Sequence, residues 1–214
     1  QDIAEEAAQV FNRLCMAQVM EETHHLLVAP KCLQNKVLDF IEEEICHADN
    51  NEPAYIGVKM NSLTDKTIID KMVEASQHGV KIDLVVRGIC CLIPGIEGYT
   101  ENIRVISIVG RYLEHSRIYI FGTPERDKMF ISSADFMTRN MVKRVEVATP
   151  IYDTAIKDRV RTMFGIMLHD TVKGRELCRD GNYYRREKPQ EESEVISSQA
   201  YFSNEAYLAA SKNV

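Results

Sequence analysis

Residues 104–146 of the 214-residue chain read RVISIVGRYLEHSRIYIFGTPERDKMFISSADFMTRNMVKRVE. Two apolar runs in this stretch, residues 119–121 and 129–131, are separated by a polar segment that contains Gly and Pro. Short apolar runs on either side of such a segment indicate a β-hairpin. The sequence therefore predicts a two-stranded hairpin with its tip at residues 122–127.

Charged side chains gather beside this hairpin. His115 and Arg117 are two residues apart at the start of the first run, so an extended strand would place both on one face. Arg144 and Glu146 have the same spacing at the start of the next apolar run. Residues 104–144 hold eight Lys or Arg and four Asp or Glu, a local charge of +4 in a chain of net charge −6. Such a cationic region predicts an anion site, and guanidinium groups suit phosphate because each donates two parallel hydrogen bonds; a solvated basic face is the alternative.

The composition is that of a globular chain. Apolar residues make up 45% and charged residues 27% of the sequence, and no apolar run approaches the roughly 18 residues that a membrane span needs. Residues 1–9 are polar and acidic, so we expect no signal peptide, and a start at Gln suggests a fragment or processed product. The acidic net charge argues against general nucleic-acid binding.

The residue types that commonly bind metals do not predict a metal site. Adjacent histidines such as His24 and His25 point to opposite faces of a strand and make a poor chelate. The cysteines form no C-x-x-C pair and mostly lie in apolar periodic segments, which favours buried reduced thiols in a cytosolic protein. The six are Cys15, Cys32, Cys46, Cys90, Cys91 and Cys178.

Hydrophobic periodicity predicts alternating strands and helices on both sides of the hairpin. Further strands are expected at residues 24–29, 54–60, 81–86, 103–109 and 145–148. Helices are expected at residues 2–22, 30–48, 64–79, 154–169 and 195–208. Start and stop signals support these limits: Pro30 as a first helical residue, Ser62 or Thr64 as an N-cap, Gly79 as a helix stop and Pro150 as a strand end.

Polar residues follow two of the expected strands. Residues 81–86 are a continuous apolar run apart from Lys81 and Asp83, as in a strand buried on both faces, and Arg87 comes next. Lys59 and Asn61 stand at the end of the preceding strand. Because ligands of open α/β sheets bind at the carboxyl ends of strands, Arg87 is a second candidate for the anion site, with Lys59 and Asn61 a weaker third.

Four segments together resemble one known family. They are VVRG at 85–88, NIRVISIVGRYLEHSRIYIF at 102–121, ISSADFMTRN at 131–140 and RVEVATP at 144–150. In this order they resemble the C-terminal domain of bacterial polyphosphate kinases, a likeness that covers residues 2–169. The resemblance implies an α/β fold, a phospholipase-D-like sandwich with a mixed central sheet flanked by helices.

The resemblance also implies an activity. That family reversibly transfers the terminal phosphate of ATP to inorganic polyphosphate through a phosphohistidine in the preceding domain. It uses Mg²⁺, whose ligands would lie largely outside this chain. The implied partners are ATP or ADP, polyphosphate, the preceding domain of the same polypeptide and further copies of the full-length chain, with no nucleic acid. The implied location is cytoplasmic, peripheral at the inner membrane, and we expect the isolated segment to be inactive.

Site residues follow by matching positions. Arg87 matches a nucleotide-contacting arginine, and His115 matches a second active-site histidine that contacts nucleotide phosphate and assists proton transfer. Glu146 matches an acidic residue near that site. From the residues themselves, Arg117 and Arg144 would add fixed positive charge for phosphate, and Glu114 or Glu146 would orient His115.

The expected organisation has three parts. Residues 1–22 would form a helix at the junction with a preceding domain, residues 23–172 the phospholipase-D-like catalytic domain, and residues 173–214 a polar tail with a short helix. Two other functions stay open. One is a phospholipase-D-type phosphodiesterase, although Arg117 replaces the Lys of its H-x-K motif, Gly122 replaces its Asp, and only one copy is present. The other is a non-catalytic polyanion-binding module.

Overall fold

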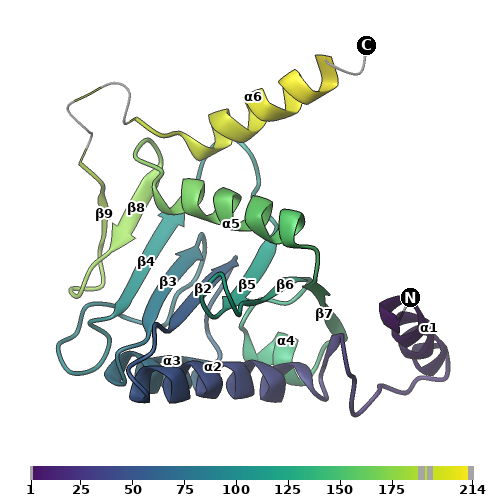
Figure 1. Ribbon diagram of the computed structural model, residues 1–214. Helices are drawn as coiled ribbons and strands as arrows, with labels where there is room; N and C mark the ends of the chain where they lie inside the picture. The colour runs from purple at the N-terminus through teal and green to yellow at the C-terminus, as the bar shows by residue number, and fades with distance from the viewer. Residues whose placement is uncertain (1, 188–190, 192–194, 212–214) are drawn as a thin grey trace.

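A mixed β-sheet covered by helices on both faces forms the body of the protein (Figure 1). The computed structural model describes residues 2–187, 191 and 195–211. The strands are β1 Leu27–Ala29, β2 Tyr55–Met60, β3 Lys81–Val86, β4 Ile103–Ile108, β5 Arg117–Phe121, β6 Lys128–Ser132, β7 Glu146–Ile151, β8 Gly174–Leu177 and β9 Tyr183–Arg185. The helices are α1 Asp2–Cys15, α2 Leu33–Asp49, α3 Lys66–Gln77, α4 Thr138–Val142, α5 Thr154–Leu168 and α6 Ser198–Ser211.

The strand order in the sheet is β1-β7-β6-β5-β2-β3-β4-β8-β9. Strands β2, β3 and β4 run parallel, and the predicted hairpin is the antiparallel pair β5–β6, which joins them through β2. The expected mixed α/β architecture is confirmed. Within the described part of the chain, none of the helices has the length and apolar character that crossing a bilayer requires.

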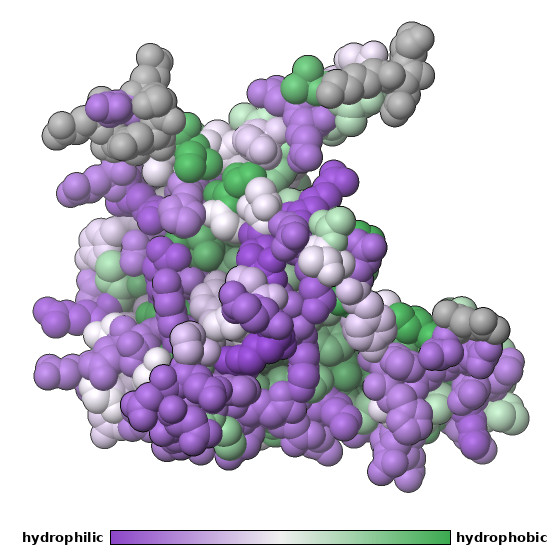
Figure 2. Space-filling view, in the orientation of Figure 1, coloured by the Kyte–Doolittle hydropathy of each residue, from purple (hydrophilic) through white to green (hydrophobic). Residues whose placement is uncertain are grey.

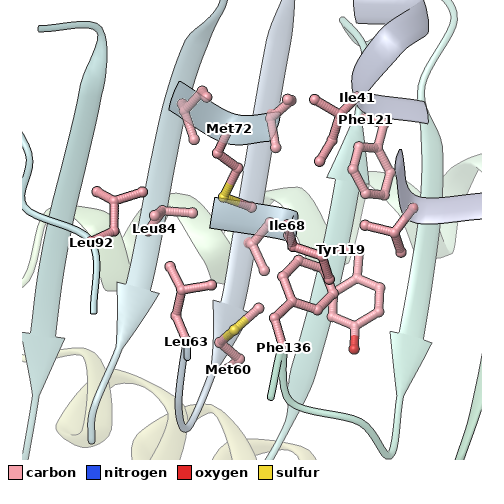
Figure 3. Packing of buried hydrophobic residues seen from close by; sticks show 14 of the residues in the cluster. Ile41, Met60, Leu63, Ile68, Met72, Leu84, Leu92, Tyr119, Phe121 and Phe136 are labelled. Atoms are coloured by element: carbon pink, nitrogen blue, oxygen red, sulfur yellow. The ribbon is translucent and has the colours of Figure 1, made fainter. Parts of the chain in front are cut away.

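Each face of the sheet packs against its own helices. In the view of Figure 1, α2 and α3 run along the bottom of the sheet and α5 along the top. The larger apolar cluster lies on the α2–α3 side, where the Tyr119 and Phe136 rings meet at 4.7 Å between centroids and Met60 and Ile68 pack nearby (Figure 3). Phe164 of α5 anchors the cluster on the other face.

Several predicted limits were wrong, each for a local reason. The first helix ends at Cys15 rather than residue 22, because Ala17 has φ of 56° and the Gln18 N–H bonds back to the Arg13 carbonyl. The helix expected from Pro30 begins at Leu33, after a turn at residues 30–32.

Capping and pairing explain two further corrections. The N-cap of α3 is Asp65, whose carboxylate accepts a hydrogen bond from the Ile68 N–H at 3.1 Å, rather than Ser62 or Thr64. Pro150 lies inside β7, where it pairs with Phe130 of β6. This is tolerated because β1 covers β7 only as far as Ala148, so that no strand on that side needs an N–H from residue 150.

The C-terminal region differs most from expectation. Residues 174–177 and 183–185, expected within a polar tail, form the hairpin β8–β9, which extends the sheet beyond β4. The helix of the tail is present as α6, but most of its side chains are exposed on all sides, so it is not the amphipathic helix expected. Figure 2 shows a largely polar face with apolar side chains gathered near the base of α6.

The cysteines match the expectation in part. All six are free thiols. However, only Cys32 is buried, and Cys15, Cys46 and Cys91 are exposed, because these three occupy the solvent side of their helices or loop rather than the apolar face.

We expect Phe136→Ala to lower the free energy of unfolding by about 3–5 kcal/mol, because it empties a closely packed site beside Tyr119. Urea denaturation of this chain measures the effect. The control Ile131→Ala changes a β6 side chain that is 50% exposed and should cost less than about 1 kcal/mol. Equal losses in the two variants would show that Phe136 does not anchor the core.

Candidate functional site

One edge of the sheet collects the polar residues that the sequence singled out. The parallel strands β2 and β3 end at this edge, and the antiparallel strands β5 and β7 begin there. β6, which runs antiparallel to β5, also ends there. The side chains brought together from these strand ends are Lys59, Asn61, Arg87, His115, Arg117, Asp135, Arg144 and Glu146.

The Asp135 carboxylate links three of these strand ends. It accepts hydrogen bonds from Arg117 Nε at 3.2 Å and from Arg117 Nη2 at 3.1 Å. It also accepts from the Asn61 backbone N–H at 2.7 Å and from the Asn61 side-chain amide at 3.0 Å. The Asn61 side-chain oxygen in turn accepts from Arg87 Nε at 2.6 Å. Two arginines from non-adjacent strands are thus fixed by one buried acid.

Asp135 stays ionised in this position. Burial by itself would raise the pKa of its carboxyl group, since the residue is only 6% exposed. The hydrogen bonds and positive charge of Arg117, together with the Asn61 N–H, outweigh burial and hold the pKa below its usual value. Asp135 lies in the quoted segment 131–140 but had no predicted role; its place a few residues after an apolar run was the available signal.

Close backbone approach completes the Arg87 position. The Gly88 N–H donates to the Asn61 carbonyl at 2.8 Å. A Cβ at residue 88 would lie 2.8 Å from that same carbonyl oxygen, which is closer than side chains tolerate. Glycine is therefore needed for the end of β3 to pass against the end of β2 and to present Arg87 beside Asn61.

A second network supports the segment after β6. The Asp135 N–H donates to the Asn140 side-chain oxygen at 3.0 Å, and the Asn140 amide donates to Glu146 at 3.2 Å. Glu146 is 4% exposed and also accepts from the Ser133 hydroxyl. Arg144, which is largely exposed, bonds Glu146 through Nε at 3.2 Å. The residues of ISSADFMTRN thus hold one another and Glu146 in place.

His115 lies just before β5, in the loop at residues 109–116, and is exposed. The Arg117 guanidinium lies beside its ring, with Nη1 to Nδ1 and Nη2 to Nε2 both 3.4 Å, and Nη1 also donates to the His115 carbonyl at 3.1 Å. The expected proximity of His115 and Arg117 is present, although it arises from this contact rather than from shared strand geometry.

Neither predicted carboxylate contacts the His115 ring among the hydrogen bonds of the described residues. Glu114 instead lies 3.7 Å from the Lys59 ammonium, and the Gln199 amide donates to it at 3.2 Å. Glu146 is occupied by Ser133, Asn140 and Arg144, as described above. Both acids bind other partners in this arrangement, so the expectation that Glu114 or Glu146 orients His115 gains no support from the contacts of the described residues.

Lys59 ties the histidine loop to the sheet. Its ammonium group is almost fully buried and donates to the Ser116 carbonyl and hydroxyl, each at 2.9 Å. Burial lowers the pKa of Lys59, against the opposing attraction of the Glu114 carboxylate. The sequence marked Lys59 as a weak candidate for anion binding. In the structure its ammonium group instead holds the loop in position.

The C-terminal segment holds the same loop from outside. The Gln199 side chain accepts from the Tyr112 N–H at 3.0 Å and donates to the Tyr112 carbonyl at 2.8 Å. Ser198, the first residue of α6, donates to the Asp170 carboxylate through its N–H at 2.8 Å and its hydroxyl at 2.6 Å. Neither Gln199 nor Asp170 was singled out from the sequence. For Gln199 the reason is that nothing in a polar tail marks which amide reaches a loop 85 or more residues away.

An open apolar pocket of about 650 Å³ lies between this loop and α6. Its lining includes His115, Met163, Met167, Phe202 and Tyr207. No group of three His, Cys, Asp or Glu side chains suited to a metal ion occurs in the described part of the chain. Arginine side chains suited to an anion and a pocket suited to an apolar group thus lie side by side in the candidate site.

Comparisons with known proteins point to one family. The family model "Polyphosphate kinase C-terminal domain 2" matches residues 26–199. A polyphosphate kinase of Bacillus cereus is 51% identical over 183 residues, which is 86% of this chain but 26% of that protein. The chain therefore spans about a quarter of the length of that relative.

Solved structures give the same answer for the fold. The crystal structure of polyphosphate kinase from Porphyromonas gingivalis superposes with a TM-score of 0.89 at 33% identity, covering 99% of this chain and 32% of that one. A phospholipase D family member from Salmonella typhimurium superposes with a TM-score of 0.52 at 15% identity, covering 72% of this chain and 96% of that one, which shows a shared fold. The phospholipase-D-like architecture is thereby confirmed, and the chain belongs to the polyphosphate kinase family, as a member of its C-terminal domain 2.

Proposed function

We propose that this chain is the catalytic C-terminal part of a polyphosphate kinase that reversibly transfers the terminal phosphate of ATP to inorganic polyphosphate. The observation that carries the proposal is the Asp135 network, which fixes Arg117 beside His115 and, through Asn61, Arg87 at the same sheet edge in a member of this family. The family's preceding domain would supply the histidine that becomes phosphorylated.

Arg87 is the main phosphate ligand in this proposal. Its Nε is bound to Asn61, and no hydrogen bond to its two terminal nitrogens is found among the described residues. The guanidinium is therefore oriented while its terminal nitrogens stay available for a phosphate group. Arg117 adds positive charge beside His115, and the more exposed Arg144 would add further positive charge at the same sheet edge. Fixed cations of this kind stabilise the charge that phosphoryl transfer spreads over the phosphate oxygens.

His115 would hold or relay a proton on the phosphate of ADP, the leaving group of the transfer. Its exposed ring lies between Arg117 and the apolar pocket, where the nucleoside part of ATP has room. Mg²⁺ would arrive with ATP, and it supplies charge neutralisation on the phosphates when bound. Glu146 is buried, so we assign it to holding Ser133, Asn140 and Arg144 rather than to proton transfer.

The phospholipase-D-type function lacks a supporting observation. The likeness to a phospholipase D family member concerns the fold alone, and Arg117 occupies the position of the required lysine.

The free thiols and the family membership are compatible with the cytoplasmic location that we also propose.

In the full-length enzyme, we expect His115→Ala to reduce polyphosphate synthesis by a factor of about 10² to 10⁴, the range typical of a general acid–base residue. The control is His78→Ala, which removes an exposed histidine at the end of α3, before the opposite end of β3. Synthesis is measured as labelled phosphate transferred from ATP to polyphosphate. Near-normal turnover by a folded His115→Ala enzyme would exclude the assigned role.

We expect the isolated chain to form no phosphohistidine when incubated with labelled ATP, because its proposed phosphate acceptor lies in another domain. Acid-labile, base-stable label on this chain alone would contradict the proposal. The full-length enzyme, labelled under the same conditions, is the positive control.

Asp135→Asn tests the network on which both arginines depend. Because the folded-state pKa of Asp135 is lowered, its ionised form stabilises the fold above the unfolded pKa of about 3.9, and this stability is lost as the pH falls through the folded-state value. We expect the variant to be about 1–3 kcal/mol less stable near neutral pH. The difference from the wild type should shrink below about pH 4. Urea unfolding at both pH values measures it, and a difference independent of pH would refute the ionised-carboxylate argument.

A further inference from the structure

A second group of cations lies beside Arg87, on the side away from His115. A cavity of about 420 Å³ is lined by Arg87, Ser107, Lys173, Arg175 and Tyr183, with Gly88 and Val109, and its lining contains no carboxylate. β3, which ends one residue before Arg87, is separated from β8, which carries Arg175, by β4 alone. The cavity therefore adjoins the candidate site and extends it toward the C-terminal hairpin.

The hairpin places like charges directly opposite each other. Arg175 of β8 pairs with Ser107 of β4 on one side and with Arg185 of β9 on the other. Leu177, two residues after Arg175, packs in the cluster on the α2–α3 face, so Arg175 and Arg185 both project on that face. Two arginines opposite each other on one face repel, and this repulsion destabilises the hairpin unless an anion lies between or beside them.

The ion pairs found among the described residues do not include the cations of this group, Arg87, Lys173, Arg175 and Arg185. This contrasts with other arginines of the sheet and helices: Arg104 pairs with Asp83, Arg126 with Glu44 and Arg161 with Asp127. The cation group beside Arg87 thus carries an unneutralised charge that suits an anion.

The dimensions indicate a chain rather than a single phosphate. Going from Arg117 on β5 to Arg175 on β8 crosses the steps β5-β2-β3-β4-β8. At about 4.8 Å a step, the cations span roughly 19 Å along the sheet edge. Tyr183 is the one aromatic side chain in the cavity lining, so the row of stacking rings typical of single-stranded nucleic-acid sites is absent from it.

We propose that Lys173 and Arg175, with Arg185 beside them, bind the part of a polyphosphate chain that lies away from its reacting end. The reacting end would lie at Arg87 and His115. This inference rests on the proposed kinase function and adds a role for the β8–β9 hairpin: it favours long chains over short ones.

The test uses the full-length enzyme making ATP from ADP and polyphosphate, supplied either as long chains or as short chains of a few units. In Lys173→Ala/Arg175→Ala, we expect the KM for long chains to rise roughly tenfold, with weaker dependence on salt, because two charge-assisted contacts are lost. The KM for short chains should change less than about twofold, because they end before Lys173. The matched control is Arg179→Ala, which removes an exposed arginine from the turn of the same hairpin.

The outcomes distinguish a failure of the proposed kinase function from a failure of the role proposed for the β8–β9 hairpin. A wild-type enzyme without any polyphosphate-dependent ATP formation would refute the proposed function. An active wild type whose KM for long chains is unchanged in the double variant would refute the hairpin's role. Equal increases for long and short chains would also refute it, since they would place the cations at the reacting end.

Two further arms keep the test decisive. If single-stranded DNA competes with long polyphosphate as strongly as unlabelled polyphosphate does, the surface binds polyanions in general and the specific proposal is wrong. Thermal melting establishes that each variant is folded, and the single variant Lys173→Gln, at an exposed position, replaces the double variant if the latter unfolds.

Discussion

The buried carboxylate of Asp135 is the interaction on which the candidate site depends. A charged group that is only 6% exposed is stable only where hydrogen bonds offset its loss of hydration. Arg117 and the backbone and side-chain amides of Asn61 donate those hydrogen bonds to Asp135. Because the partners come from the ends of β2 and β5, the same bonds fix the relative position of two strand ends. Arg87 is then oriented indirectly, through the Asn61 oxygen, which leaves its terminal nitrogens for a ligand.

The sheet makes this convergence possible. Parallel strands β2 and β3 have their carboxyl ends at one edge, and the antiparallel hairpin β5–β6 begins and ends at that edge. Packing on both faces, with α2 and α3 on one and α5 on the other, keeps these ends from moving independently. The arginines of the candidate site are consequently held on a rigid frame, as charge stabilisation without reorganisation requires.

The loop that carries His115 is stabilised in a different way, by long-range polar contacts. Lys59 bonds the loop from the sheet, and Gln199 bonds it from the first turn of α6. Asp170 fixes the start of α6 and also accepts N–H groups that lead into β8. Gln199 thus connects the histidine loop to α6, and Asp170 connects α6 to the cationic hairpin, so that the C-terminal region packs beside the candidate site rather than forming a separate tail.

The sequence by itself determined the alternation of strands and helices, the β5–β6 hairpin and the candidates Arg87, His115 and Arg117, because hydrophobic period and strand-end charge are local properties of the chain. Its four ordered motifs also pointed to the family, which the comparisons confirmed. Only the tertiary structure decided that Asp135 joins the arginines, that Glu146 supports a loop instead of a histidine, and that residues beyond 173 extend the sheet. These outcomes depend on which strands become neighbours and on which polar groups are buried together, and neither is set by the spacing of residues along the chain.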